Sequence, residues 1–170
     1  MDSYSFYSES FIPRAGFMFK TLILIIPFVF ISCSKSSLTK ELENKLLSIL
    51  EKNQTIQESL LQNKIPDFSI LKNSIIEITQ ISNQNPALKQ KLEELNQIIS
   101  KTKNDLSDET FQALSDFSTK LSEILVENQI KTEYNKFHCP MVSKYWIAKG
   151  VQVNNPYAPD MRDCGELVNK

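Results

Sequence analysis

The feature that most constrains the fold is the absence of glycine from Phe17 to Lys149. Only two prolines, Pro66 and Pro86, lie between Cys33 and the CPM string that begins at residue 139. Glycine and proline are the residues that most readily end a helix. The stretch between them is rich in Leu, Ile, Lys, Glu, Gln and Asn, so it predicts helices divided at the two prolines.

Four segments of this stretch carry apolar residues at intervals of three and four, the spacing of amphipathic helices. The first segment spans about 38–62. The second opens with Asp67 as a predicted N-cap, and the third opens with Asn85 as N-cap and Pro86 at the first helical position. The fourth segment starts near Ser107.

The sequence therefore predicts an all-α fold, an antiparallel bundle of about four helices over 38–133. A long hairpin in which the second and third helices merge is the alternative, and Pro86 argues against it. The predicted core residues are Leu42, Leu46, Ile49, Ile56, Leu60, Phe68, Leu71, Ile75, Ile78, Leu88, Leu92, Leu95, Ile98, Phe111, Leu114, Phe117, Leu121 and Ile124.

A short apolar segment precedes the predicted helices. Lys20 stands before the apolar run 21–31, and the small residue Ser32 follows that run, directly before Cys33. A positively charged residue, then a short apolar run, then a small residue before the cleavage site are typical of a secretory signal. A transmembrane helix needs about 20 apolar residues, and this run is about half that length and is broken by Pro27.

The segment from Met18 to Cys33 resembles the signals of bacterial lipoproteins, with Phe30 where Leu is usual. The resemblance implies cleavage before Cys33, a diacylglyceryl group on its thiol and a link to the membrane. We expect a signal peptide at 1–32 and a polar tether at 33–37. An uncleaved membrane anchor and a secretion signal cut elsewhere are the alternatives.

Two acidic residues, Asp2 and Glu9, precede Lys20. Acidic residues ahead of the positively charged region suit a secretory signal poorly, so translation is expected to begin at Met18. Ser34 lacks the acidic inner-membrane signal known from some bacteria, which favours the outer membrane within the cell envelope. Beyond residue 32 the chain holds 17 basic and 18 acidic residues, so nothing indicates nucleic-acid binding.

The composition changes near Tyr134. The region 134–170 holds the only Trp, the only His and two of the three cysteines. We expect a loop-rich Cys/Met module packed on the bundle, with a short hairpin formed by 145–147 and 151–153.

Five residues of this region suggest a soft-metal site. Three of them, His138, Cys139 and Met141, lie within four residues, and Met161 and Cys164 follow about 20 residues later. Thiolate and thioether sulfurs favour Cu(I) or Ag(I). A Zn(II) site suits the pattern less well, because there is no CxxC and one histidine cannot complete a Cys2His2 set.

A disulfide between Cys139 and Cys164 is the competing interpretation, since cysteines in extracytoplasmic domains commonly pair. The bond would close a loop of about 25 residues and contribute about 3 kcal/mol. Oxidation would abolish thiolate binding and reduction would restore it, so both interpretations stay open.

The tail is also similar to the end of a family of periplasmic domains of unknown function. Members occur alone, often as lipoproteins, and attached to adaptor (membrane-fusion) subunits of copper/silver efflux systems. The resemblance implies a helical domain that handles copper through its Cys and Met residues, with an efflux adaptor as a partner. The matching residues are Cys139-Pro140-Met141, Tyr145-Trp146, Asn155-Pro156-Tyr157, Met161 and Cys164-Gly165.

No nucleophile elbow, glycine-rich phosphate loop or HExxH string is present. The neighbours His138 and Cys139 are poorly placed for catalytic geometry, so we expect no enzyme. The leading hypothesis is a lipid-anchored Cu(I) binder that buffers the metal or passes it to efflux. The alternatives are a structural or interaction lipoprotein with a disulfide and no metal, and an envelope spacer or host-binding protein that uses its Asn/Gln-rich helix faces.

Overall fold

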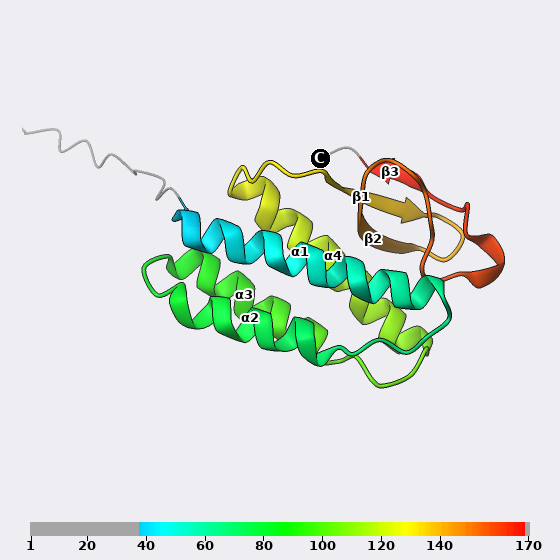
Figure 1. Ribbon diagram of the computed structural model, residues 1–170, viewed down its shortest axis with the longest axis horizontal. Coiled ribbons are helices and arrows are strands. Elements are labelled where there is room, and N and C mark those ends of the chain that lie inside the picture. The colour runs from blue at the N-terminus through cyan, green and yellow to red at the C-terminus, as the bar shows by residue number, and fades with distance from the viewer. Residues whose placement is uncertain (1–37, 169–170) are drawn as a thin grey trace, which may run out of the picture. The chain divides into compact units, whose positions relative to one another are not determined.

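The computed structural model describes residues 38–168; the expected signal peptide, Cys33 and the tether up to residue 37 lie outside this range. Four helices form most of it, and successive helices run in alternating directions (Figure 1). None of the helices within 38–168 is long and apolar enough to cross a bilayer. The helices are α1 (Lys40–Leu61), α2 (Ser69–Ile81), α3 (Pro86–Ile99) and α4 (Asp108–Glu127).

Polar side chains fix where the helices begin. Asn85 caps α3 by accepting a hydrogen bond from a backbone amide three residues on, and Ser107 caps α4 in the same way. The prediction for Asn85 is therefore confirmed. The N-cap position of α2 is Phe68, so the prediction that Asp67 caps this helix is wrong. Asp67 instead accepts a bond from the amide of Ser69 and forms the turn before the helix.

The predicted apolar stripes face one shared core. Of the predicted core residues, all are buried except Ile98 and Phe111, which are half-buried. Ile99 takes the buried position on α3 because it continues the spacing of Leu92 and Leu95, three and four residues apart. The separate helices α2 and α3 confirm that the chain turns at Asn85-Pro86.

The all-α prediction is wrong for the C-terminal region, although turns and loops still connect its strands. It folds into a three-stranded antiparallel sheet of β1 (Tyr134–Cys139), β2 (Lys144–Lys149) and β3 (Glu166–Val168), in the order β2-β1-β3. The strands are short: β1 alternates apolar and polar residues only over 137–139, and β2 carries the unbroken apolar run 145–148. The molecule is thus mostly helical with a small sheet.

The predicted hairpin of 145–147 with 151–153 is also wrong. Residues 145–147 pair with 136–138 of β1 across a turn at Pro140–Ser143. Phe137 then stands opposite Trp146, and both side chains are fully buried. Cross-strand aromatic pairs of this kind stabilise one register over others.

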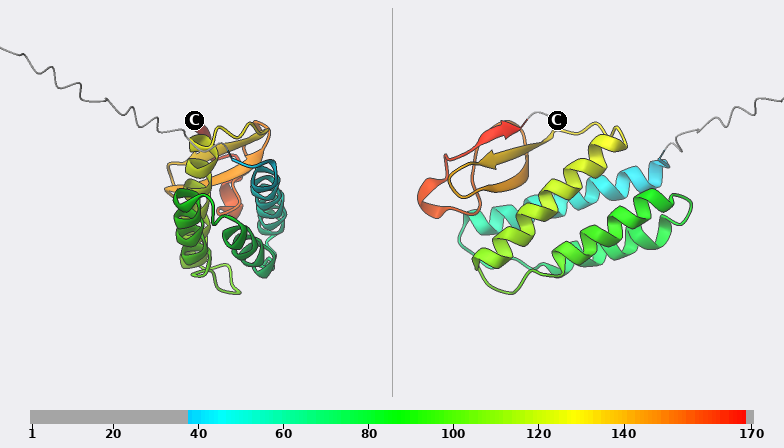
Figure 2. Two further views of the ribbon diagram at one scale, coloured as in Figure 1. Left: turned by 90° about the vertical axis from the view of Figure 1, so that its left-hand side faces the viewer. Right: turned by 180° about the vertical axis from the view of Figure 1, so that it is seen from behind.

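The sheet lies across the first and last helices. The packed neighbours are α1 with α2, α2 with α3 and α3 with α4, and β2 contacts both α1 and α4. Figure 2 shows the strands on the side of α1 and α4 that faces away from α2 and α3. One hydrophobic cluster joins the helices to Phe137, Trp146 and Tyr157, so the sheet completes the helical core.

Candidate functional site

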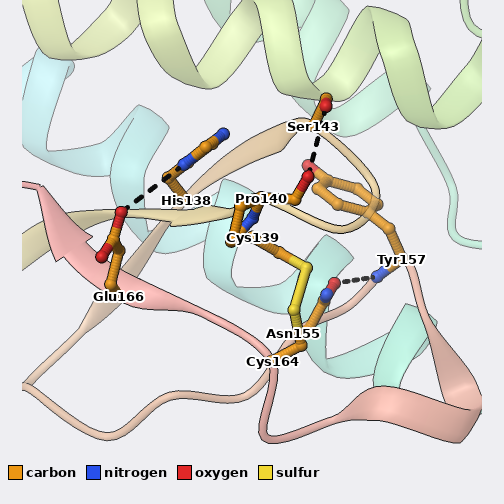
Figure 3. The surroundings of a disulfide bond; sticks show 8 residues. All are labelled: His138, Cys139, Pro140, Ser143, Asn155, Tyr157, Cys164 and Glu166. Carbon is orange, nitrogen blue, oxygen red and sulfur yellow. Dashed lines mark hydrogen bonds and ion pairs between the residues drawn. A yellow bond between two sulfur atoms is a disulfide. The ribbon is translucent and has the colours of Figure 1, made fainter.

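The Cys139–Cys164 disulfide is the centre of the candidate site. Cys139 ends β1 and is fully buried, and Cys164 lies two residues before β3. Their Cα atoms are 5.5 Å apart, within the range that a disulfide requires, and the two sulfur atoms are bonded (Figure 3). Neither sulfur is therefore a thiolate, which is the form that binds soft metals.

The two methionines of the predicted metal site both lie between the bonded cysteines in sequence. Met141 is in the β1–β2 turn, and 72% of its side chain is exposed. Met161 ends a short 3-10 helix, η1 (Pro159–Met161), and is half-buried. Neither thioether has a polar partner among residues 38–168, and neither is part of the core.

His138 belongs to the opposite face of the sheet from Cys139, because successive side chains of a strand point to opposite faces. Its ring stacks on Tyr145 with centroids 4.4 Å apart, and Nδ1 lies 3.8 Å from a carboxylate oxygen of Glu166. Figure 3 shows the ring of His138 beside Glu166 rather than beside the disulfide. Within 38–168, no three His, Cys, Asp or Glu side chains are placed to hold a metal ion.

An aromatic cluster packs next to the disulfide. The rings of Phe137 and Trp146 stack with centroids 5.5 Å apart, and Tyr157 meets Trp146 edge-on at 6.4 Å. Phe111 of α4 lies 5.5 Å from Tyr157 and links the cluster to the bundle. Burial raises the pKa of Tyr157 above its ordinary value, so its hydroxyl is protonated at every physiological pH.

Gly165 lies against the indole of Trp146. A Cβ atom at this position would stand 2.5 Å from Cη2 of Trp146 and 3.0 Å from a methyl carbon of Val153. Real Cβ atoms are essentially never this close to a neighbour, so only glycine fits while the indole keeps its place. The disulfide at the adjacent Cys164 holds the backbone in this position.

The segment between β2 and β3 closes on itself around Asn155. The side-chain oxygen of Asn155 accepts a hydrogen bond from the amide of Tyr157, which forms an Asx turn. The backbone amide of Asn155 donates to the carbonyl of Arg162, and the guanidinium of Arg162 donates to the carbonyl of Asn155. The Asn-Pro-Tyr string therefore shapes a loop and places Tyr157 in the core.

Arg162 binds this loop to the end of α1. Its Nη2 donates to the carbonyls of Leu60 and Leu61, each at 3.3 Å, and to Oδ1 of Asn63 at 2.9 Å. The last carbonyls of a helix lack partners inside the helix and carry partial negative charge. Burial lowers the pKa of the guanidinium, and the carboxylate of Asp160 opposes this shift; the group stays charged at neutral pH.

Side chains of α1 and α4 cover the free edge of β2. Ser115 accepts from the amide of Tyr145 at 2.8 Å, and Asn53 donates to the carbonyl of Ile147 at 3.0 Å. Gln54 accepts in the same way from the amide of Lys149. The edge of the sheet is thus satisfied by helices instead of a fourth strand.

Sequence reasoning missed these docking residues, although two of them left a signal. Asn53 interrupts the apolar stripe of α1, four residues after Ile49, where a polar side chain needs a buried partner. Ser115 is the first of three buried serines at intervals of three and four on α4. Small residues in such a row allow another element to approach a helix closely. No comparable pattern marks Arg162.

The fold and the site define a disulfide-linked, mostly helical domain in which a C-terminal sheet is built onto the first and last helices. Comparisons of the chain with models of known protein families, with curated proteins and with solved structures gave no match.

Proposed function

We propose that this chain is a lipid-anchored protein of the cell envelope whose disulfide-locked sheet has a structural or interaction role. The observation that carries the proposal is the Cys139–Cys164 disulfide, which occupies both sulfurs that a soft metal would need as thiolates. Disulfides persist in extracytoplasmic compartments. The lipoprotein-like segment from Met18 to Cys33 supports attachment to a membrane, with the outer membrane favoured by Ser34.

Expression of the full chain in bacteria, followed by mass spectrometry of the protein isolated from the envelopes under non-reducing conditions, tests this proposal. We expect a mass lower than that of the reduced protein by two hydrogen atoms, no alkylation of Cys139 or Cys164 before reduction, and alkylation of both afterwards. The peptide that begins at Cys33 should carry lipid. In the matched variant Cys33→Ser the lipid should be lost and the disulfide kept. Alkylation of Cys139 or Cys164 in native protein without a reductant would contradict the disulfide role.

A Cu(I) site in the reduced chain is a second proposal, supported by the resemblance to domains attached to copper/silver efflux adaptors. The ligands would be Cys139, Met141, Met161 and Cys164, with His138 optional. Reduced protein should then compete with a Cu(I) chelator, and Cys139→Ser should lower the affinity at least about tenfold, whereas Cys33→Ser should not. Equal binding by the Cys139→Ser, Cys164→Ser and parent proteins would end this proposal. Ag(I) is tested in the same way.

A further inference from the structure

A groove runs between the C-terminal half of α4 and the face of the sheet that carries Tyr134. Its volume is about 470 Å³, within the range of about 300–1,000 Å³ that is usual for small-molecule sites. It lies apart from the disulfide and from all five residues of the predicted metal site. Its apolar lining consists of Leu125, Val126, Ile130, Tyr134 and Ile147.

The floor of the groove is continuous with the core. Leu125, Ile130 and Ile147 are buried, whereas 47% of Val126 is exposed, one of the few large apolar side chains of the described chain that face solvent to this extent. Apolar surface therefore extends from the core to the mouth of the groove. Exposed apolar surface in a groove favours a ligand that has an apolar part of its own.

Two lysines stand on the rim of the groove, and the carboxylates of Glu51, Glu58 and Glu133 act on Tyr134 in its lining. Lys131 and Lys136 both line it, and neither forms an ion pair with another residue of 38–168. The ammonium of Lys136 lies 5.0 Å from the ring centre of Tyr145. The carboxylate of Glu133, between the two lysines in sequence, is paired with Lys149 at 3.1 Å. Two cations at the edge of an apolar groove complement a ligand with an apolar body and an anionic end.

We propose that this groove binds a single-chain anionic amphiphile, with the alkyl chain on the apolar floor and the anionic head between Lys131 and Lys136. A long-chain fatty acid is the simplest member of this class. The proposal does not depend on lipid at Cys33, because every residue that it uses lies between Ser122 and Ile147.

Photolabelling of the full chain with a diazirine analogue of palmitic acid tests the proposal. Cross-linked peptides, located by mass spectrometry, should fall within 122–136 and around Ile147. The matched fatty alcohol, which has the same chain and no charge, should label these peptides about fivefold less, since two exposed ion pairs are worth about 1 kcal/mol together. Equal labelling by the acid and the alcohol, or labelling spread over the whole surface, would overturn it.

Two pairs of variants distinguish binding in the groove from nonspecific binding to the rest of the surface. Val126→Asp should abolish labelling of the groove, whereas Ile76→Asp, at a residue of similar exposure on α2, should not. The double variant K131E/K136E should remove the preference for the acid over the alcohol. The control K72E/K101E changes the net charge equally, outside the groove, and should keep the preference. If both double variants behave alike, the lysines are not the recognition groups.

Discussion

Gly165 shows how a single position can require one residue type. The constraint is steric and does not come from the backbone conformation of the glycine. A Cβ atom at this position would lie 2.5 Å from the indole of Trp146. The indole cannot move aside easily, since it is fully buried and stacked on Phe137. The sequence contains the glycine next to Cys164, but only the fold shows which ring it faces.

Replacement of Gly165 by Ala should lower the free energy of unfolding by about 1–3 kcal/mol, the usual cost of overpacking a core. Urea denaturation of the oxidised chain, followed by tryptophan fluorescence, would measure the loss and report the environment of Trp146. Val151→Ala, at a side chain that is 76% exposed in the same segment, is the control and should change stability little. Unchanged stability of Gly165→Ala would show that the indole is free to shift.

Arg162 illustrates a contact that sequence reasoning cannot find. One planar guanidinium reaches carbonyls at the end of α1 and the carbonyl of Asn155 in its own loop. Lysine has no such fork and would satisfy fewer of these acceptors from one point. Nothing in the residues around position 162 marks it, because its partners at the end of α1 lie about 100 residues away.

At the scale of elements, β2 depends on the helices for its outer hydrogen bonds. An uncovered strand edge would present a row of unpaired backbone groups to other chains. Here Ser115 and Asn53 bind alternate residues of that edge, and Asn53 is only 2% exposed. Each bond therefore joins the sheet to a different helix and fixes how β2 lies across both.

Ser115→Ala should leave the amide of Tyr145 without its protein acceptor, at a cost of about 0.5–1.5 kcal/mol, the usual net value of a hydrogen bond, because this bond is only partly buried. Hydrogen exchange of that single amide, followed by NMR, should become faster, and the amides in the middle of α3 should keep their protection. Ser100→Ala, at an exposed serine beyond the end of α3, serves as the control. Unaltered exchange at Tyr145 in the Ser115→Ala protein would mean that the edge is not protected by this bond.

The helices could be predicted from the sequence and the sheet could not, because the helices are long and the strands are short. The stripe of α1 repeats from Leu42 to Leu60, long enough for its period to be read without tertiary information. The strands β1 and β2 are six residues each, and both carry lysines among their apolar residues. For the site, the sequence left two interpretations open, a Cys139–Cys164 disulfide and a soft-metal site. The bonded sulfurs favour the disulfide for the oxidised chain and do not decide what the reduced chain binds.

At the scale of the whole molecule, the disulfide joins β1 to the segment before β3 across a separation of 25 residues. Cys139→Ala/Cys164→Ala should lower the free energy of unfolding by about 3 kcal/mol, the value expected for a loop of this length. Guanidinium denaturation would measure the loss, and the far-ultraviolet circular dichroism of the helices should remain at low denaturant. The control is Cys33→Ala, outside the described residues. Equal stability of the double variant and this control would contradict a structural role.

The bond from Arg162 to Leu60 spans 102 residues, far more than the contacts between successive helices. Closing a longer loop costs more entropy, so contacts between distant residues form late in folding. Synthesis delivers α1 to α4 before residue 162. During that interval one flank of α1 and α4 is open to water, and this is when a nascent chain of this kind is most vulnerable to proteases and to association with its own copies.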